Sequence, residues 1–293
     1  MTRTRPIEAR DRHTAAIANA TVYNSGWTEI FTEGAPHLKH ASLRALLARL
    51  IRRVYERAVV HTPTPLVLDL GAGEGSVTRQ WLELGARVTA VDVSSSQLAE
   101  LDRKCERYRD PLETRCGDVG EVLRELDGPF DVVVASACLH HLPDYLGVVG
   151  DAIKLLAPHG QFLSFQDPLR YDTVSRFTRA FGELSYLSWR MLQGDLWGGL
   201  RRRLRRRVLD ESPLDDSPLN YAEYHVVRGG VDQDAIVALL AASGFECEII
   251  RYFSTQSRVF QPLGAALGLQ NTFGILGERR AVERHGNRAL DCQ

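Results

Sequence analysis

The sequence lacks the features that mark secreted proteins, membrane-spanning proteins and proteins with structural metal sites. Its five cysteines are odd in number, widely spaced and form no C-x-x-C pair, which argues against a disulfide framework and a structural zinc site. The N-terminal segment has no apolar signal region, and no later stretch approaches the roughly 20 apolar residues that a membrane span needs. The net charge of -1 creates no long-range field that would collect nucleic acid or an anionic membrane. We therefore expect a cytoplasmic protein without a membrane span or a nucleic-acid partner.

What the sequence does contain is an alternation of short β-branched runs and amphipathic segments between residues 66 and 276. Such an alternation is typical of βαβ units laid into a mostly parallel sheet, so it predicts an α/β fold. With 293 residues, the chain is long enough for one large core with appended elements. The predicted strands are 66–70, 87–92, 113–116, 130–136, 161–166, 247–252 and 272–276.

Helices are predicted where capping residues bound the segments between the strands. They are 76–84, 94–107, 145–156 and 232–243, with a further helix at 41–60 before the first strand. An insertion rich in aromatics, arginine and proline follows the fifth strand and is too long for an ordinary connection, so we expect a substrate lid there. The predicted division is an N-terminal helical cap at 1–64, an α/β core at 65–167 and 226–280, the lid at 168–225 and a C-terminal tail at 281–293.

The strongest motif is VLDLGAGEG at 67–75, in which an apolar strand carrying an acid leads into three alternating glycines and a helix. Gly71, Gly73 and Gly75 let the backbone turn sharply and approach a ligand without a Cβ in the way, while the following helix presents free N–H groups. The motif therefore predicts a nucleotide-binding loop. Its spacing is G-x-G-x-G rather than the G-x-G-x-x-G of dinucleotide sites, which disfavours NAD and FAD.

Two more acids stand at the ends of the neighbouring strands. Asp92 closes the second predicted strand, where its carboxylate can accept hydrogen bonds from both hydroxyls of a ribose. Asp118 follows the third strand, where it can accept the amino proton of an adenine. Both have a simpler alternative, because either carboxylate could instead cap the helix that follows it.

The motifs at 69–75, Asp92, Asp118 and FDVVVAS at 130–136 resemble the successive motifs of Rossmann-like (class I) S-adenosylmethionine-dependent methyltransferases. This resemblance covers about residues 66–166. It implies a doubly wound, seven-stranded, mostly parallel sheet of order 3-2-1-4-5-7-6, with the last strand antiparallel.

The same resemblance implies that S-adenosylmethionine is the cofactor. Gly71, Gly73 and Gly75 would border its methionine part. Asp69 would lie at its amino group, Asp92 at the ribose and Asp118 at the adenine. The other residues placed at the cofactor are Ala72, Val93, Val119 and Ser136.

A methyl group on a sulfonium is already activated for displacement, so the enzyme chiefly holds the nucleophile, excludes water and adds a base when the nucleophile carries a proton. His140 and His141 follow the fourth predicted strand, at the edge where open α/β sheets bind ligands. Either histidine could be that base near neutral pH, and both could instead only shape the loop. Asp167 lies at the same edge as an alternative base or substrate anchor, although capping a loop is the more common role.

The N-terminal cap offers candidate ligand contacts. Tyr23 and Trp27, with Phe31, could close over the cofactor, since a sulfonium cation is attracted to aromatic faces, or they could simply pack against the sheet. His37 and His40 lie three residues apart, but no Cys, His or carboxylate is spaced to complete a metal site, so we predict no metal.

The run from Arg201 to Arg207 has apolar residues at Leu200, Leu204 and Val208, which predicts a helix with one arginine-covered face. Its simplest interpretation is a solvated lid helix neutralised by nearby acids. An anionic substrate, an acidic carrier protein or a membrane surface are the functional alternatives.

The sequence as a whole predicts an S-adenosylmethionine-dependent methyltransferase that acts on a small molecule, at oxygen or nitrogen rather than carbon, in biosynthesis or secondary metabolism. An enzyme of the same fold with a non-methylating reaction such as cyclisation is the alternative, because methyl transfer needs few catalytic side chains. A regulatory protein with a vestigial pocket is disfavoured by the intact glycines and acids. An RNA-methylating enzyme would bind polynucleotides with a steep salt dependence. The sequence leaves a homo-oligomer open.

Overall fold

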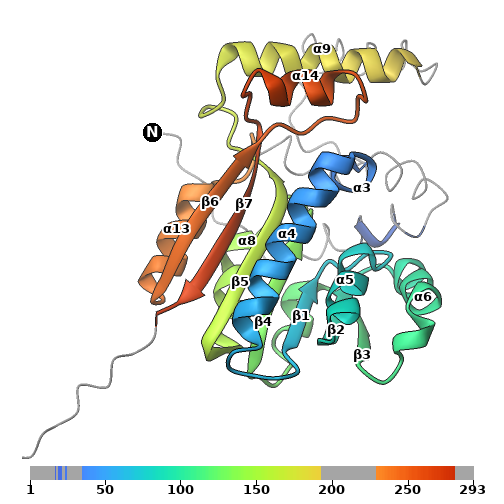
Figure 1. The fold of residues 1–293 in the computed structure, drawn as a ribbon, viewed down its shortest axis with the longest axis vertical. Coiled ribbons are helices and arrows are strands. Elements are labelled where there is room, and N and C mark those ends of the chain that lie inside the picture. The colour runs from blue at the N-terminus through green and yellow to red at the C-terminus, as the bar shows by residue number, and fades with distance from the viewer. Residues whose placement is uncertain (1–16, 18, 22–23, 25–34, 193–228, 281–293) are drawn as a thin grey trace, which may run out of the picture.

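The computed structural model describes residues 17, 19–21, 24, 35–192 and 229–280. Within them, the strands form one seven-stranded sheet of order β3-β2-β1-β4-β5-β7-β6 (Figure 1). Neighbouring strands are parallel except around β7, which pairs antiparallel with both β5 and β6. The predicted fold class and strand order are confirmed. The strands are β1 (Leu66–Leu70), β2 (Arg87–Asp92), β3 (Leu112–Cys116), β4 (Phe130–Ser136), β5 (Leu156–Pro168), β6 (Phe245–Tyr252) and β7 (Thr272–Arg279).

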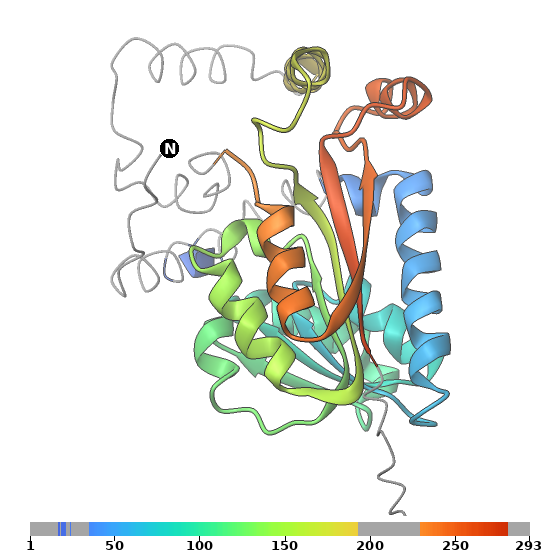
Figure 2. The ribbon, with the colours of Figure 1, turned by 90° about the vertical axis from the view of Figure 1, so that its left-hand side faces the viewer.

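Helices cover both faces of the sheet (Figure 2). One face carries α4 (Ala41–Ala58), α5 (Ser76–Leu84) and α6 (Ser95–Lys104), and the other carries α7 (Val119–Val122), α8 (Tyr145–Lys154) and α13 (Gln233–Ala242). Strand residues alternate between the two layers, so Val132 packs on the α4 side and Val133 on the α8 side. Because both faces are covered, all residues of β4 are buried and the strand has a nearly continuous apolar sequence.

The predicted helix 145–156 is too long at its C-terminal end. It ends at Lys154 because the chain already joins the sheet there: Leu156 pairs with Phe130, whose N–H donates to the oxygen of Leu155 at 2.8 Å. The predicted strand 161–166 is correspondingly too short, since β5 begins at Leu156 and contains a register shift before Gln161.

The predicted helix 94–107 is also shorter than expected. Ser94 is its N-cap and Cys105 its C-cap, and a separate 3-10 turn, η1 (Glu106–Tyr108), follows. Smaller differences arise where helix ends stop early or strand pairing continues beyond the β-branched residues. The elements concerned, each with its predicted range in parentheses, are α4 (41–60), β3 (113–116), α13 (232–243), β6 (247–252) and β7 (272–276).

Two helices, α9 (Arg176–Leu192) and α14 (Phe260–Ala266), lie beyond the C-terminal edge of the parallel strands, at one end of the molecule (Figure 1). The Phe181 ring joins them, with its centroid 5.6 Å from that of Phe253 and 5.3 Å from that of Phe260. α9 is the described part of the predicted lid, whose bounds remain a prediction. No helix in the described part of the chain is both long enough and apolar enough to cross a membrane.

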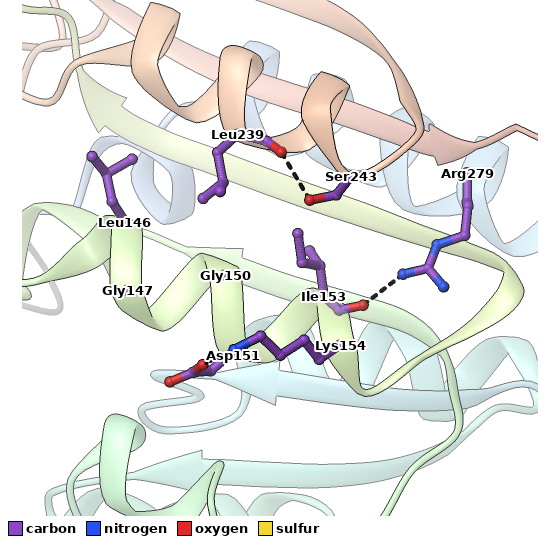
Figure 3. A pocket seen from close by; sticks show the side chains of 9 residues that line it. All are labelled: Leu146, Gly147, Gly150, Asp151, Ile153, Lys154, Leu239, Ser243 and Arg279. Carbon is purple, nitrogen blue, oxygen red and sulfur yellow. Dashed lines mark hydrogen bonds and ion pairs between the residues drawn. The ribbon is translucent and has the colours of Figure 1, made fainter.

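A hollow of about 390 Å³ lies between α8 and α13, beside the C-terminal end of β7 (Figure 3). Ile153 and Leu239 are among its apolar walls. The charged groups around it already have partners: Lys154 Nζ lies 2.7 Å from Asp151 Oδ1, and Arg279 donates to the oxygen of Ile153 at 2.7 Å. The hollow is therefore a feature of helix packing and not a candidate active site.

Gly264 of α14 is expected to tolerate no side chain, because an added Cβ would lie 2.2 Å from Cδ1 of the buried Phe253. Gly264→Ala should lower the free energy of unfolding by about 1–3 kcal/mol through overpacking. Gly182→Ala in α9 is the matched control, since its Cβ would meet no atom of the described part of the chain within 4 Å and alanine favours a helix by about 0.5–1 kcal/mol over glycine. Denaturant unfolding of the wild type and the two variants measures both effects. An unchanged free energy of unfolding in Gly264→Ala would contradict the packing of α14 against Phe253.

Candidate active site

The glycine loop joins β1 to α5 and is anchored to β2. The N–H groups of Gly71 and Ala72 both donate to the oxygen of Val91, at 2.8 and 3.0 Å. Gly71, Gly73 and Gly75 have φ values of 68°, 54° and 87°, which lie in the left-handed region where side chains are costly. The sequence motif thus forms the sharp turn that it predicts.

The loop packs against the protein at Gly71 and is open at Gly73. A Cβ on Gly71 would lie 2.7 Å from Sγ of Cys138, so this glycine is required by close packing. Among the described residues, a Cβ on Gly73 would have one neighbour within 4 Å, Oε1 of Gln97 at 3.9 Å. Gly73 therefore marks the place where a ligand can approach the backbone.

Asp92 ends β2 and holds the loop in position. Its two carboxylate oxygens accept the N–H groups of Gly73 and Ser94, each at 2.8 Å. Burial raises the pKa of Asp92, and these backbone hydrogen bonds oppose the shift. Ser94, and not Asp92, caps α6, by accepting the N–H of Gln97. Because each carboxylate oxygen has two acceptor sites, Asp92 keeps capacity for the hydroxyls of a ribose.

Asp69, near the end of β1, has an incompletely bonded carboxylate. Oδ2 accepts from Oγ1 of Thr78 at 2.6 Å, whereas the buried Oδ1 has no partner in the described residues. Burial raises the pKa of Asp69 to about 7. A cationic group at Oδ1 would satisfy this oxygen and favour the charged carboxylate, so the site suits the ammonium group of an amino acid moiety.

The remaining residues predicted at the cofactor lie around this loop. Asp118 caps α7, since its Oδ1 accepts the N–H of Glu121 at 3.1 Å, and the capping alternative is therefore correct for this residue. Ser136 ends β4, and its buried Oγ lacks a partner among the residues that the structure describes. The other three are buried or half-buried apolar residues: Ala72, Val93 and Val119.

The thiol of Cys138 marks the point where the four predicted acids converge. Burial raises its pKa well above the usual value, and the charges of Asp167, Asp92, Asp69 and Asp118 raise it further. Acids from the ends of β1, β2, β3 and β5 therefore act on one buried thiol, as expected where parallel strands end at a common edge.

His140 is paired with the buried Asp167 at this edge. Nδ1 of His140 lies 2.8 Å from Oδ1 of Asp167, and the same oxygen accepts the backbone N–H of His140 at 3.1 Å. Asp167 thus holds the 3-10 turn η2 (Leu139–His141) and also orients the imidazole. The ring of His141 lies beside that of His140, with centroids 4.0 Å apart.

Burial determines which protons this pair holds. It lowers the pKa of His140 to about 3, with a further contribution from the charge of His37, and it raises the pKa of Asp167 to about 8. Since the two side chains share a hydrogen bond, they titrate as one unit. Loss of one proton leaves the carboxylate accepting from Nδ1–H and a lone pair on Nε2, which is the form that can act as a base.

Strained backbone brings the two partners together. Ala137 and Gln166 have φ values of 52° and 69°, and the N–H of Ala137 donates to the oxygen of Phe165 at 2.7 Å. The β5–β7 register shifts at the same place, between Ser164 and Asp167. Non-glycine residues in the left-handed region cost energy and cluster at functional sites.

Residues from β6 and the segment after it hold this strained conformation. The N–H of Gln166 donates to Oη of Tyr252 at 2.9 Å, and its Nε2 donates to Oγ of Ser254 at 2.6 Å. The position of Asp167 therefore depends on a strand that lies much later in the sequence.

His37 is a third histidine at this edge, considered above only as a metal ligand. It is 6% exposed, and its Nδ1 has no partner within the described ranges. Its ring packs edge-on against Phe165, with centroids 6.5 Å apart. Burial lowers its pKa to about 4, so it is neutral at pH 7. The feature of the sequence that could have indicated this position is Pro36, because proline often starts a helix and here begins the short helix α3 (Pro36–Lys39) that contains His37.

The N-terminal segment contacts the site near the histidines of η2 and near Asp92. Nδ2 of Asn19 donates to the oxygen of His141 at 3.4 Å, and Oγ of Ser94 donates to Oδ1 of Asn24 at 2.8 Å. The aromatics Tyr23, Trp27 and Phe31 and the run from Arg201 to Arg207 lie outside the described residues, and their roles remain predictions.

We expect the free energy of unfolding to fall as pH rises from about 6.5 to about 8. Over this interval folded Asp69 and Asp167 keep protons that the unfolded chain has lost, because burial raises their pKa values to about 7 and about 8. Each retained proton lowers stability by about 1.4 kcal/mol per pH unit. The lowered pKa values of His37 and His140 act below 6.5, where they make stability rise with pH.

Asp167→Asn tests this assignment, because asparagine keeps the oxygen that accepts the N–H of His140 but cannot titrate. Chemical denaturation at a series of pH values should show a flatter dependence for the variant than for the wild type. Identical slopes between pH 6.5 and about 8 would show that Asp167 does not hold the proton.

Comparison with known proteins shows what the core of this chain is similar to. Residues 67–160 match the family model described as "Methyltransferase domain", so this segment is similar to methyltransferases. The segment is 33% identical over 120 residues to a ubiquinone biosynthesis O-methyltransferase of Xanthomonas campestris, covering 39% of this chain and 48% of the relative. It is 32% identical over 118 residues to a demethylmenaquinone methyltransferase of Tropheryma whipplei, covering 39% and 47%. These matches span about half the length of the relatives.

Solved structures extend the likeness of the fold to most of the chain. The 1,6-didemethyltoxoflavin-N1-methyltransferase of Burkholderia thailandensis has a TM-score of 0.50 at 19% identity, over 94% of this chain and 92% of that one. The magnesium protoporphyrin IX methyltransferase of Synechocystis PCC 6803 has a TM-score of 0.53 at 14% identity, over 91% and 100%. At these identities the likeness concerns the fold.

Proposed function

We propose that this protein transfers the methyl group of S-adenosylmethionine to a hydroxyl group of a small molecule. The observation that carries the proposal is the hydrogen bond between His140 and the buried Asp167, at the same sheet edge as the glycine loop. A hydroxyl must lose its proton to become a strong nucleophile, whereas a neutral amine already has a lone pair. A histidine oriented by a carboxylate to act as a base therefore favours oxygen over nitrogen as the acceptor atom.

The residues around the glycine loop fit the proposed cofactor. Asp69 Oδ1 would accept the ammonium group, the open side of Gly73 would lie against the methionine part, and Asp92 would accept the ribose hydroxyls. Asp118 can contact the adenine with the oxygen that does not cap α7. When bound, S-adenosylmethionine supplies a methyl group on a positively charged sulfur, ready for in-line displacement.

In this proposal His140 is the general base. Its Nε2 accepts the proton of the acceptor hydroxyl, and the carboxylate of Asp167 stabilises the imidazolium that forms. Burial keeps water from competing for the same proton. Because the active form appears when the pair loses a proton, activity should rise as pH approaches the raised pKa of Asp167, about 8.

The named relatives support a biosynthetic role. The two relatives in the previous subsection are named for ubiquinone biosynthesis and for demethylmenaquinone. We accordingly propose an acceptor with a ring hydroxyl, in quinone or secondary metabolism.

The proposal is tested by incubating the purified full chain with S-adenosylmethionine and a panel of phenols, sugars and amines. Mass spectrometry then measures both the demethylated cofactor and the methylated acceptor. We expect both products with at least one hydroxylated acceptor and neither with the amines alone. Cofactor turnover without any methylated product would instead support a non-methylating reaction, and turnover confined to amines would contradict the role of the base.

A further inference from the structure

The outer surface of α9 and α14 is unusually apolar. Of the eleven large hydrophobic side chains that the described residues expose, seven lie on these two helices or at their ends. Six of them define what we call the apolar platform, and each is 50–63% exposed. They are Phe177, Leu184 and Met191 on α9, and Val259, Leu263 and Leu267 on and beside α14.

These residues form one stripe along each helix. On α9 they recur every seven residues and on α14 every four, so each set lies along one side of its helix. Neither stripe is the side on which its helix packs: Thr178 and Ser185 of α9 and Gln261 and Gly264 of α14 are the buried positions. Exposed apolar side chains gathered on two neighbouring helices are typical of a surface that binds something.

The charges around the platform have mainly one sign. Between residues 254 and 277 the sequence contains no acid and one base, Arg258, which is exposed at the start of α14. The sequence of α9 has three arginines and one acid, Glu183. An apolar stripe flanked by arginines is the pattern of a helix that lies in the interface of an anionic membrane.

The orientation of the two helices agrees with that pattern. Both run across the long axis of the molecule and lie flat at one of its ends, beyond the C-terminal edge of the parallel strands (Figures 1 and 2). We infer that the apolar platform docks the protein on the surface of an anionic lipid bilayer, at the end of the molecule that carries the candidate active site. This inference stands on exposure and charge and does not require the proposed methyl transfer.

A second copy of the chain is a less suitable occupant. A two-fold dimer through the platform would bring two copies of Arg176, Arg179 and Arg258 to one interface, whereas the sequence of α9 contains one acid, Glu183. Anionic headgroups instead complement all three arginines.

Flotation with vesicles tests the inference on the full chain. We expect binding to vesicles of phosphatidylcholine mixed with phosphatidylglycerol, and weaker binding to phosphatidylcholine alone or at high salt. The double substitution Leu263→Glu with Leu267→Glu should weaken binding by at least about tenfold, because two apolar side chains no longer enter the interface. Val60→Glu is the matched control, since Val60 is 77% exposed and follows the C-terminal end of α4, which lies at the opposite end of the molecule from α9 and α14 (Figure 1), and it should bind like the wild type.

Several results would overturn the inference. The first is a wild-type protein that does not float with either vesicle, and the second is an equal loss in Val60→Glu. A third is a concentration-dependent dimer that the double substitution dissociates, which would assign the platform to a second copy. A fourth is a large fall in unfolding temperature for the double variant, which would mean that residues of the chain itself cover the platform.

Discussion

Replacing Asp92 by alanine should weaken the binding of S-adenosylmethionine by about 100-fold or more. The substitution removes the acceptor for the ribose hydroxyls, and hydrogen bonds to a charged group contribute about 1.5–3 kcal/mol each. It also removes the acceptor for the N–H groups of Gly73 and Ser94, so the glycine loop loses its anchor on β2. Calorimetric titration with the cofactor and its demethylated product measures the change.

Asp131→Ala is the matched control for this variant. Asp131 is 5% exposed and its Oδ2 accepts the N–H of Leu66 at 2.8 Å, so it is a buried acid with a similar bonding role. It stands at the start of β4, at the opposite edge of the sheet. We expect Asp131→Ala to lose stability but keep cofactor affinity. Equal affinity losses in the two variants would mean that Asp92 acts through general stability, and unchanged affinity in Asp92→Ala would refute the proposed ribose contact.

Replacing His140 by asparagine should lower the rate of methyl transfer by about 100-fold to 10,000-fold, the usual contribution of a general base. Cofactor affinity should stay within a few fold of the wild type, because His140 is not among the residues proposed to hold the cofactor. Asp167→Asn should give a smaller loss of rate, since the imidazole remains but its cation is no longer stabilised. Single-turnover measurements with saturating cofactor separate the chemical step from binding.

The protein contains a second His–Asp pair that serves as a control. Nε2 of His159 lies 3.1 Å from Oδ1 of Asp131, at the edge of the sheet away from the glycine loop. His159→Asn should leave the rate of methyl transfer unchanged. If His141→Asn abolishes transfer while His140→Asn does not, the base has been assigned to the wrong histidine. If His140→Asn and His141→Asn both remain active, neither of these histidines serves as the base.

The cofactor half of the site could be predicted because its signals are local. Gly71, Gly73 and Asp92 stand at turns and strand ends, where the sequence pattern and the backbone conformation coincide. Parallel strands then carry these residues to one edge without further information. Asp118 shows the limit of such reasoning, since its capping role depends on the α7 N–H groups and is compatible with a ligand contact as well.

The acceptor half could be predicted only as a set of candidates. His140, His141 and Asp167 are recognisable as polar residues at strand ends, but the bond between His140 and Asp167 depends on the left-handed conformation of Gln166. Glutamine has no intrinsic preference for that conformation, so nothing local indicates it. His37 was missed as a site residue for a similar reason, because its burial follows from the packing of α3 against Phe165.

Gln166 is held by hydrogen bonds to Tyr252 of β6 and to Ser254, and this determines the order in which parts of the site form during synthesis of the chain. The glycine loop, Asp69 and Asp92 are complete once β1, β2 and β4 have paired, which needs only the first half of the chain. Gln166 receives its partners Tyr252 and Ser254 more than 80 residues later. A ribosome-bound chain can therefore form its cofactor loop before the base is oriented, and catalytic competence waits for the arrival of the last two strands.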